Sequence, residues 1–72
     1  MKLYVILELA PSEEQGFDEA RVVEVFEREE DATVVLSALE SVNVLHNTYI
    51  IHRCKQSELP KSTWHKVKIH LN

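Results

Sequence analysis

The sequence predicts a small α+β domain of the order ββαββ, a four-stranded antiparallel sheet with one helix on one face. Two observations carry this prediction: apolar and polar residues alternate with a period of two near both ends of the chain, and a single stretch in between has helical spacing. Residues 1–72 are expected to form one domain, since a chain this short buries only about 60% of the surface that its unfolded form exposes.

Residues 2–9 are expected to form the first strand. Apolar side chains occupy the odd positions from Leu3 to Leu9 and so share one face, while Tyr4 and Ile6 fall on the other. The next strand is predicted over residues 21–27, which are rich in β-branched and aromatic residues. The acidic stretch 13–19 contains the only glycine and is expected to be an exposed hairpin connection.

A helix is predicted over residues 29–41. Apolar residues recur there at i, i+3, i+4 and i+7, from Ala32 to Leu39, which places them on one stripe. Three carboxylates fall in the first turn, where the helix dipole favours negative charge.

Two further strands are expected after the helix, over residues 48–55 and 64–71, with a turn at residues 56–62. A right-handed crossover through the helix places the third strand beside the first and antiparallel to it. The fourth strand is then expected to pair with the third as a hairpin, which gives the spatial order 2-1-3-4.

One helix can cover only one face of this sheet. We expect the opposite face to present Tyr4 and Ile6, with basic residues of the fourth strand beside them. The residues expected in the core are Val5, Leu7, Val25 or Phe26, Leu36, Leu39, Val67 and Ile69. A homodimer is expected to bury this open face, or the edge of strand two or four, because exposed Tyr4 and Ile6 would be costly.

Charge divides the chain into two unlike halves. Residues 1–45 hold eleven acidic and three basic residues, whereas residues 46–72 hold five basic residues, one acidic residue and all four histidines. This asymmetry predicts two surfaces of opposite potential, each able to recruit a different partner. The alternative is that the two surfaces attract each other, within the molecule or between copies.

Three short motifs carry a resemblance to other small proteins. They are Met-Lys-Leu-Tyr-Val-Ile at residues 1–6, Val-Val-Glu-Val-Phe at residues 22–26, and Glu-Asp-Ala at residues 30–32. Over about residues 1–55 the chain resembles a broad group of short, uncharacterised phage and bacterial ββαβ proteins. Glu24 and Arg28 depart from that pattern, which often has Gly and a Ser or Thr cap there. The resemblance implies a phage- or mobile-element-encoded accessory protein and no particular activity.

No catalytic residues, no metal site and no cofactor are expected. The chain lacks a glycine-rich phosphate loop, a nucleophile elbow and a metalloprotease helix motif. His52 and Cys54 share a strand face, but nothing there orients the imidazole, so a small buried cysteine is the better interpretation. A more specific alternative is a zinc site in which His65 or His70 joins His52 and Cys54 as a third ligand, yet structural zinc normally takes four ligands.

The acidic half supplies the favoured binding surface. Its candidate partner-binding residues are Glu13, Glu14, Asp18, Glu19, Glu29, Glu30 and Asp31. Carboxylates at this density can occupy a basic nucleic-acid groove of a larger protein, as a DNA mimic does. We therefore expect a non-enzymatic module that binds stoichiometrically to a host protein or protein complex, such as a nucleic-acid-handling or defence complex, in an anti-CRISPR-like manner.

The alternative is a small nucleic-acid-binding module that uses the basic C-terminal hairpin. Its candidate residues are Arg53, Trp64, Lys66, Lys68 and His70, which combine positive charge with aromatic stacking surface. Few phosphate contacts would give weak, salt-sensitive affinity, so nucleic acid is the less favoured partner.

Neither a membrane nor an oxidising compartment is expected. No segment approaches the ~18 apolar residues of a membrane span, and no signal-type start is present. Cys54 is the only cysteine, so no intrachain disulfide can form. The expected location is the cytoplasm, and the host cytoplasm if the protein is phage-encoded.

Overall fold

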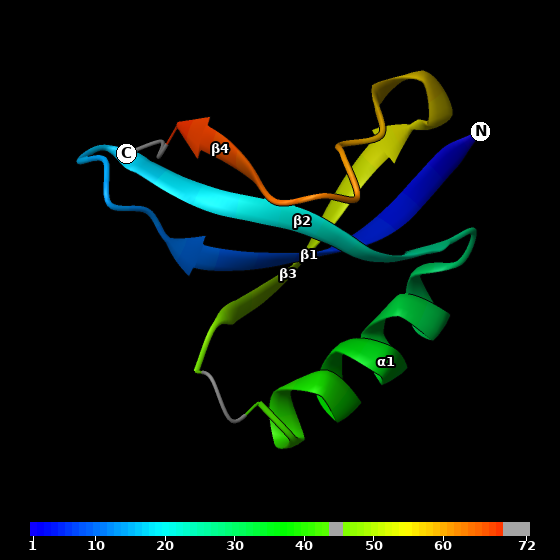
Figure 1. Ribbon diagram of the computed structural model, residues 1–72. Coiled ribbons are helices and arrows are strands. Elements are labelled where there is room, and N and C mark those ends of the chain that lie inside the picture. Colours follow the sequence, from blue (N-terminus) through cyan, green and yellow to red (C-terminus); the bar gives the residue numbers. More distant parts are fainter. Residues whose placement is uncertain (44–45, 69–72) are drawn as a thin grey trace.

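A computed structural model describes residues 1–43 and 46–68, which form a four-stranded antiparallel sheet with one helix on one face (Figure 1). The elements are β1 (Lys2–Pro11), β2 (Phe17–Phe26), α1 (Glu29–Ser41), β3 (Thr48–Lys55), the 3-10 turn η1 (Gln56–Glu58) and β4 (His65–Lys68). The predicted α+β class and the predicted helix are confirmed. The last residues of the expected fourth strand, Ile69 among them, lie outside the described residues.

The β1–β2 hairpin is longer than the sequence suggested. Its strands extend to Pro11 and back to Phe17, so the connection spans only residues 12–16. Asp18 and Glu19 therefore belong to β2 and not to an exposed loop. Gly16 has φ +87°, a left-handed conformation that glycine adopts without steric cost, and this allows the tight return.

The strand order is β3-β1-β2-β4, so the predicted order 2-1-3-4 is wrong. β1 does lie between β2 and β3 and is antiparallel to both, as expected. β4, however, pairs with the first half of β2, where Ala20 faces His65 and Phe17 faces Lys68. β4 thus covers the outer edge of β2 over residues 17–20, so the first half of β2 is not the free edge that the sequence suggested as a dimer contact.

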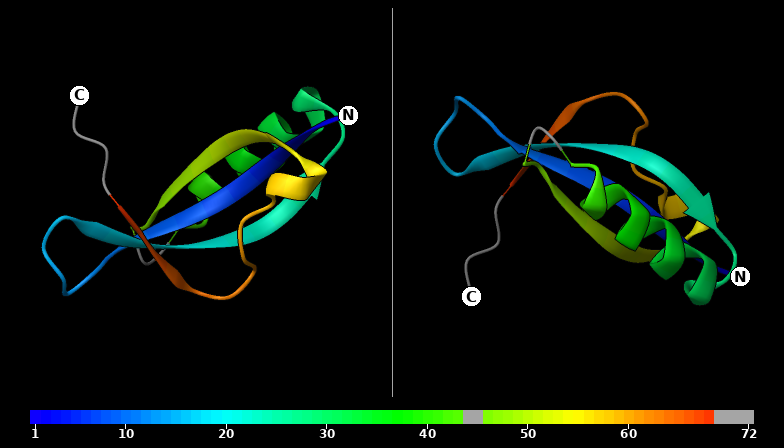
Figure 2. Two further views of the ribbon diagram at one scale, coloured as in Figure 1. Left: turned by 90° about the horizontal axis from the view of Figure 1, so that it is seen from above. Right: turned by 90° about the horizontal axis from the view of Figure 1, so that it is seen from below.

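The connection between β3 and β4 explains this order. It must span three inter-strand spacings, roughly 14 Å, and an extended segment over residues 56–64 reaches about 30 Å. Figure 2 shows it passing over the sheet face opposite the helix. The Val22 N–H donates to the Lys61 carbonyl at 3.1 Å, which fixes the crossing segment to the outer side of β2.

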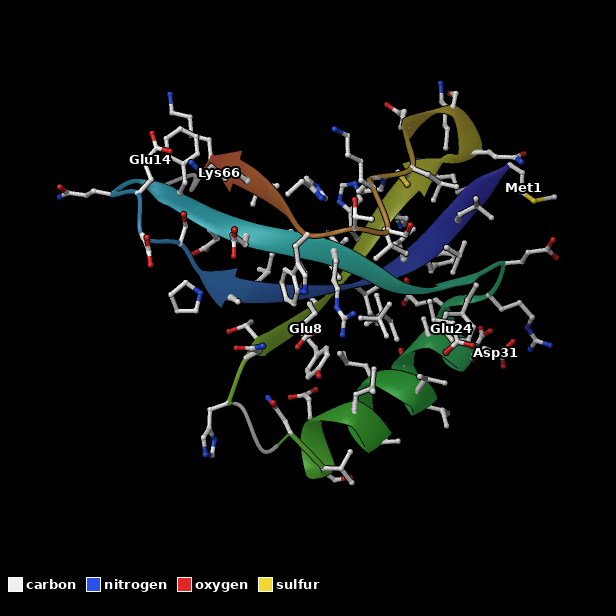
Figure 3. The ribbon with its side chains drawn as sticks, viewed as in Figure 1. Met1, Glu8, Glu14, Glu24, Asp31 and Lys66 are labelled. Atoms are coloured by element: carbon white, nitrogen blue, oxygen red, sulfur yellow. The ribbon has the colours of Figure 1, made fainter. Side chains whose placement is uncertain are left out.

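The helix covers the face that the sequence predicted to be open. Figure 3 places Glu8 between the sheet and the helix, and strand alternation puts Tyr4 and Ile6 on the same side. Ile6 and Ala32 are both fully buried there. The more apolar odd face of β1 is instead covered by residues 56–64, which the expected β3–β4 hairpin would have kept away from it.

The core therefore has two small layers. On the face opposite the helix, Val5, Leu7 and Cys54 form a buried cluster with Val22 packed against it. Of the other residues expected in the core, Phe26, Leu36, Leu39 and Val67 are only half-buried and Val25 is exposed. The buried residues that the predicted core did not include are Leu3, Ile6, Glu8, Ala20, Ala32 and Cys54.

A β-bulge contributes to these differences. Ile6 faces Glu24 while the next residue, Leu7, faces Val22, so Val23 has no partner in β1. A bulge of this kind inserts one residue into β2, so the side chains alternate between the two sheet faces in opposite phase before and after it. A single period-two pattern therefore could not describe the whole strand.

Candidate interaction surfaces

The seven acidic candidates separate into two groups at opposite ends of the molecule. Figure 3 shows Glu14 at one end and Asp31 at the other, and the longest dimension of the molecule is 34 Å. We name them the hairpin group (Glu13, Glu14, Asp18 and Glu19) and the helix-start group (Glu29, Glu30 and Asp31). They cannot act as the single continuous surface that the sequence suggested.

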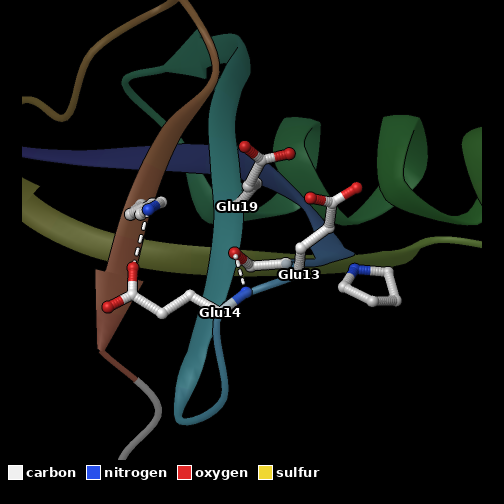
Figure 4. A pocket seen from close by; sticks show the side chains of 6 residues that line it. Glu13, Glu14 and Glu19 are labelled. Atoms are coloured by element: carbon white, nitrogen blue, oxygen red, sulfur yellow. Dashed lines mark hydrogen bonds and ion pairs between the residues drawn. The ribbon is translucent and has the colours of Figure 1, made fainter.

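Three members of the hairpin group, Glu13, Glu14 and Glu19, line an open hollow of about 580 Å³ (Figure 4). Lys66 of β4 reaches into it, and its Nζ lies 2.6 Å from Glu14 Oε2. The hydrogen bond and the negative charge of Glu14 raise the pKa of Lys66. The basic half of the chain therefore partly neutralises the acidic half here, which is the mutual attraction that the charge pattern left open.

The helix-start group is more fully exposed. Glu29, Glu30 and Asp31 are all exposed, as is the preceding Glu27. Among the residues that the structure describes, the only ion pair in this group joins Arg28 Nε to Glu30 Oε2 at 3.3 Å, with both side chains more than 70% exposed. An ion pair this exposed is strongly screened by water, so the group keeps a negative potential.

The basic candidates are divided between the two edges of the sheet. Arg53 lies on β3, whereas Lys66 and Lys68 lie on β4 at the opposite edge. Trp64 is 42% exposed, but the Arg21 guanidinium lies 5.0 Å from its ring centre. His70 lies outside the described residues. The predicted basic C-terminal hairpin is therefore not formed by the residues that the structure describes: Arg53 is separated from Lys66 and Lys68, which stay together on β4 directly after Trp64.

The prediction missed a buried carboxylate, Glu8, which is 3% exposed. Its Oε1 accepts a hydrogen bond from Arg21 Nε at 2.9 Å and forms an ion pair with Arg21 Nη2 at 2.9 Å, and its Oε2 accepts a hydrogen bond from Asn47 Nδ2 at 2.8 Å. Asn47 is held in turn by Asn43, whose amide donates to the Asn47 carbonyl and accepts from the Asn47 N–H. Glu8 thus joins both hairpin strands to the helix–β3 connection.

These contacts determine the ionisation of Glu8. Burial raises its pKa, but hydrogen bonds from Asn47 and Arg21, the charge of Arg21 and a hydrogen bond from Tyr49 together lower it below the ordinary value of 4.5. Glu8 is therefore a carboxylate at neutral pH. All of its oxygens are occupied by neighbouring side chains, so this network stabilises the fold and offers no open catalytic group.

The histidines and the cysteine do not form a metal site in the part of the chain that is described. His52 and the buried Cys54 lie on β3, while His65 lies on β4 at the far edge of the sheet. Across residues 1–43 and 46–68, no three His, Cys, Asp or Glu side chains are close enough to hold an ion. The third ligand suggested by the sequence depended on a β3–β4 hairpin, which is not formed.

An apolar groove of about 600 Å³ lies on the face opposite the helix. Its lining residues are Leu7, Leu9, Asp18, Ala20, Ile50, His52, Val67 and Lys68. The crossing segment does not fill this part of the face, and Ile50 remains 38% exposed. The groove reaches the outer edge of the sheet at β3.

Comparison with protein-family models, curated proteins and solved structures gave no match. No helix among the described residues is long and apolar enough to cross a membrane.

Proposed function

We propose that this protein is a non-enzymatic binding module that acts stoichiometrically on a basic surface of a partner protein. The observation that carries the proposal is the exposed helix-start group. In the part of the chain that the structure describes, its carboxylates are neutralised only by the exposed ion pair between Arg28 and Glu30. Charge complementarity of this kind raises association rates and selects partners. The hairpin group is the weaker candidate, because Lys66 pairs with Glu14 and because Asp18 and Glu19 are half-buried.

The partner we propose is a host protein or protein complex that normally handles nucleic acid or serves in defence. A groove built for a phosphate backbone is a basic surface, and clustered carboxylates are suited to occupy it. The proposal that the protein is a phage- or mobile-element-encoded accessory protein rests on the motif resemblance of residues 1–55 alone. We place its action in the cytoplasm of the host.

Reversing the helix-start charges tests this proposal. The triple variant Glu29→Lys, Glu30→Lys and Asp31→Lys should lose a protein partner that the wild type captures from a bacterial host lysate treated with nuclease. The matched control reverses three acids of the hairpin group, Glu13→Lys, Glu14→Lys and Glu19→Lys, and should retain that partner. Both variants should keep the wild-type far-ultraviolet circular dichroism spectrum. Loss of the partner in the control alone would contradict the assignment to the helix start.

Salt provides a second readout. Exposed charges are screened beyond about 8 Å at physiological ionic strength, so the association rate with the captured partner should fall as salt rises. The Lys66→Glu and Lys68→Glu variant should change little. Retention of nucleic acid by the wild type that is lost in this lysine variant would instead favour the nucleic-acid-binding alternative.

A further inference from the structure

The outer edge of β3 is open. Among the strands that the structure describes, β3 is an end strand that pairs only with β1, in an uninterrupted register from Lys55 opposite Lys2 to Thr48 opposite Leu9. Within residues 1–43 and 46–68, no other strand or loop forms backbone hydrogen bonds with it. Apart from the Lys55 N–H, which donates to the Glu58 side chain, its outward N–H and C=O groups are therefore free to act as a template for another strand.

The two edges of the sheet are not equivalent. β4 has only four residues, and its exposed Lys66 and Lys68 further discourage pairing. β3 has eight residues, no proline and no bulge. Residues 48–52 carry no formal charge at pH 7, so the first part of β3 lacks the usual protection of an exposed edge.

Side chains on both faces make this edge suitable for an apolar strand. The apolar groove reaches β3 at Ile50 and His52. On the helix side, Tyr49 and Ile51 are half-buried and lie at the same edge. An added strand would place alternate side chains beside Ile50 on one face and beside Tyr49 and Ile51 on the other.

The C-terminal end of β3 is basic. Lys2 lies opposite Lys55, and Arg53 is exposed two residues earlier on the same strand. In the described part of the chain, none of these three cations forms an ion pair. The neighbouring acid, Glu58, accepts a hydrogen bond from the Lys55 backbone N–H at 3.0 Å, which leaves an excess of positive charge.

We propose that the outer edge of β3 binds an extended acidic peptide segment of another protein by antiparallel strand addition. The N-terminal acids of the peptide lie beside Arg53 and Lys55, with Lys2 adding positive charge from the next strand, and its alternate apolar residues lie beside Ile50. A second copy of this chain is the poorer occupant, because its own β3 carries the same cations and no acid. This proposal concerns a surface other than the helix-start group and stands or fails independently of it.

A synthetic peptide, acetyl-Asp-Glu-Val-Thr-Val-Thr-Val-amide, is the probe. Titrated into the whole protein and followed by amide NMR, it should shift resonances concentrated in residues 48–55. Its affinity should exceed that of the peptide with Lys-Lys in place of Asp-Glu by about tenfold, which corresponds to about 1.4 kcal/mol. Equal affinity for the two peptides, or shifts centred on β4, would overturn the proposal.

Protein variants test the role of the cations. Arg53→Glu with Lys55→Glu should weaken binding of the acidic peptide by about tenfold. The matched change at the other edge, Lys66→Glu with Lys68→Glu, should alter it less than about twofold. Equal weakening by the two pairs would show non-specific attraction and refute a site at β3.

Modified peptides test strand addition without any risk to folding. Two versions of the probe each carry N-methyl groups on every second amide, one at the odd positions and the other at the even positions. Alternate N–H groups of a strand point to opposite edges, so only one version loses the donors that face β3. That version should bind at least about tenfold more weakly than the other, because paired backbone groups supply the affinity. Equal binding of the two would exclude strand addition. Sedimentation that shows a dimer through β3 before peptide is added would assign the edge to a second copy and overturn the acidic-peptide proposal.

Discussion

At the scale of single residues, Glu8 shows how a charge can be accommodated in so small a core. Arg21 and Asn47 together occupy both carboxylate oxygens, and Arg21 extends the network to the Trp64 ring. An isolated buried carboxylate would be strongly disfavoured, whereas one that is paired and hydrogen-bonded is tolerated. The sequence placed Glu8 on the solvent side of the sheet because its partners are distant in the chain.

Removing this charge should destabilise the fold in a pH-dependent way. Glu8→Gln should lower the free energy of unfolding at pH 7 by about 1–3 kcal/mol, because Arg21 loses its charged acceptor. The Arg21 side chain is 44% exposed, so water can hydrate the cation that is left. Urea denaturation measures the change, and Glu24→Gln at an exposed position of β2 is the matched control, expected within about 0.5 kcal/mol.

The direction of the pH dependence follows from the lowered pKa of Glu8. Its stabilising contribution is complete above the ordinary pKa of 4.5 and is lost as pH falls through the lower value in the folded state. Below pH 4.5 the wild type should therefore lose stability more steeply than Glu8→Gln. Parallel stability curves for the two proteins would show that Glu8 keeps its ordinary pKa in the fold.

Ile6 is the most informative apolar position. It is fully buried on the helix side of β1, whereas the sequence placed it on an open face. Ile6→Ala should cost about 2–5 kcal/mol through lost burial and a residual cavity. Val25→Ala, at a position that is 40% exposed, should cost far less. Thermal unfolding compares the two, and a small effect at Ile6 with a large one at Val25 would invert the assignment of faces.

At the scale of elements, the N-terminus of α1 lacks a side-chain cap. Arg28 is the N-cap residue of α1 and makes no side-chain cap hydrogen bond. Arg28→Ser should stabilise the protein by about 1 kcal/mol, since a serine oxygen can accept from a free N–H of the first turn. Arg28→Ala removes the exposed pair with Glu30 without adding a cap and should change stability little. Equal melting temperatures for the two variants would contradict the capping explanation.

Local patterns were sufficient to predict most of the elements. The stripe from Ala32 to Leu39 predicted the helix over the residues that form it, and β3 was predicted with its observed bounds. The hairpin strands were predicted too short, because Asp18 and Glu19 have the composition of a loop. They lie in β2 because they pair with Pro11 and Ala10 of β1 on one side and with β4 on the other. The pairing with β4 is a tertiary contact that no local window contains.

At the scale of the whole molecule, one wrongly predicted strand pairing, β4 with β3 instead of β4 with β2, changed the expected surfaces. Placing β4 beside β3 left the odd face of β1 for the helix and exposed Tyr4 and Ile6. With β4 beside β2, residues 56–64 cover that odd face and the helix covers the other. The composition of the acidic and basic surfaces was readable from the sequence, but their positions depended on this pairing. The helix-start and hairpin groups consequently lie apart, and Arg53 is separated from Lys66.

Disulfide trapping distinguishes the two strand orders directly. In a Cys54→Ala background, Glu19→Cys with Lys66→Cys places two thiols on facing residues of β2 and β4. Facing Cα atoms in an antiparallel pair are about 4.5–5.5 Å apart, within the range that a disulfide accepts. Mild oxidation at low protein concentration should therefore give a monomer with no free thiol, detected by thiol titration and mass spectrometry.

The matched control keeps the same cysteine on β4 and moves the other to β3. His52→Cys with Lys66→Cys would bring the thiols close together only in a β3–β4 hairpin, because in the order β3-β1-β2-β4 two strands lie between them. Two intervening strands separate the pair by roughly 14 Å, more than twice the Cα separation that a disulfide spans. This variant should keep both thiols under conditions that oxidise the first. Rapid closure in the His52 pair and none in the Glu19 pair would restore the order 2-1-3-4, and with it an open face at Tyr4 and Ile6.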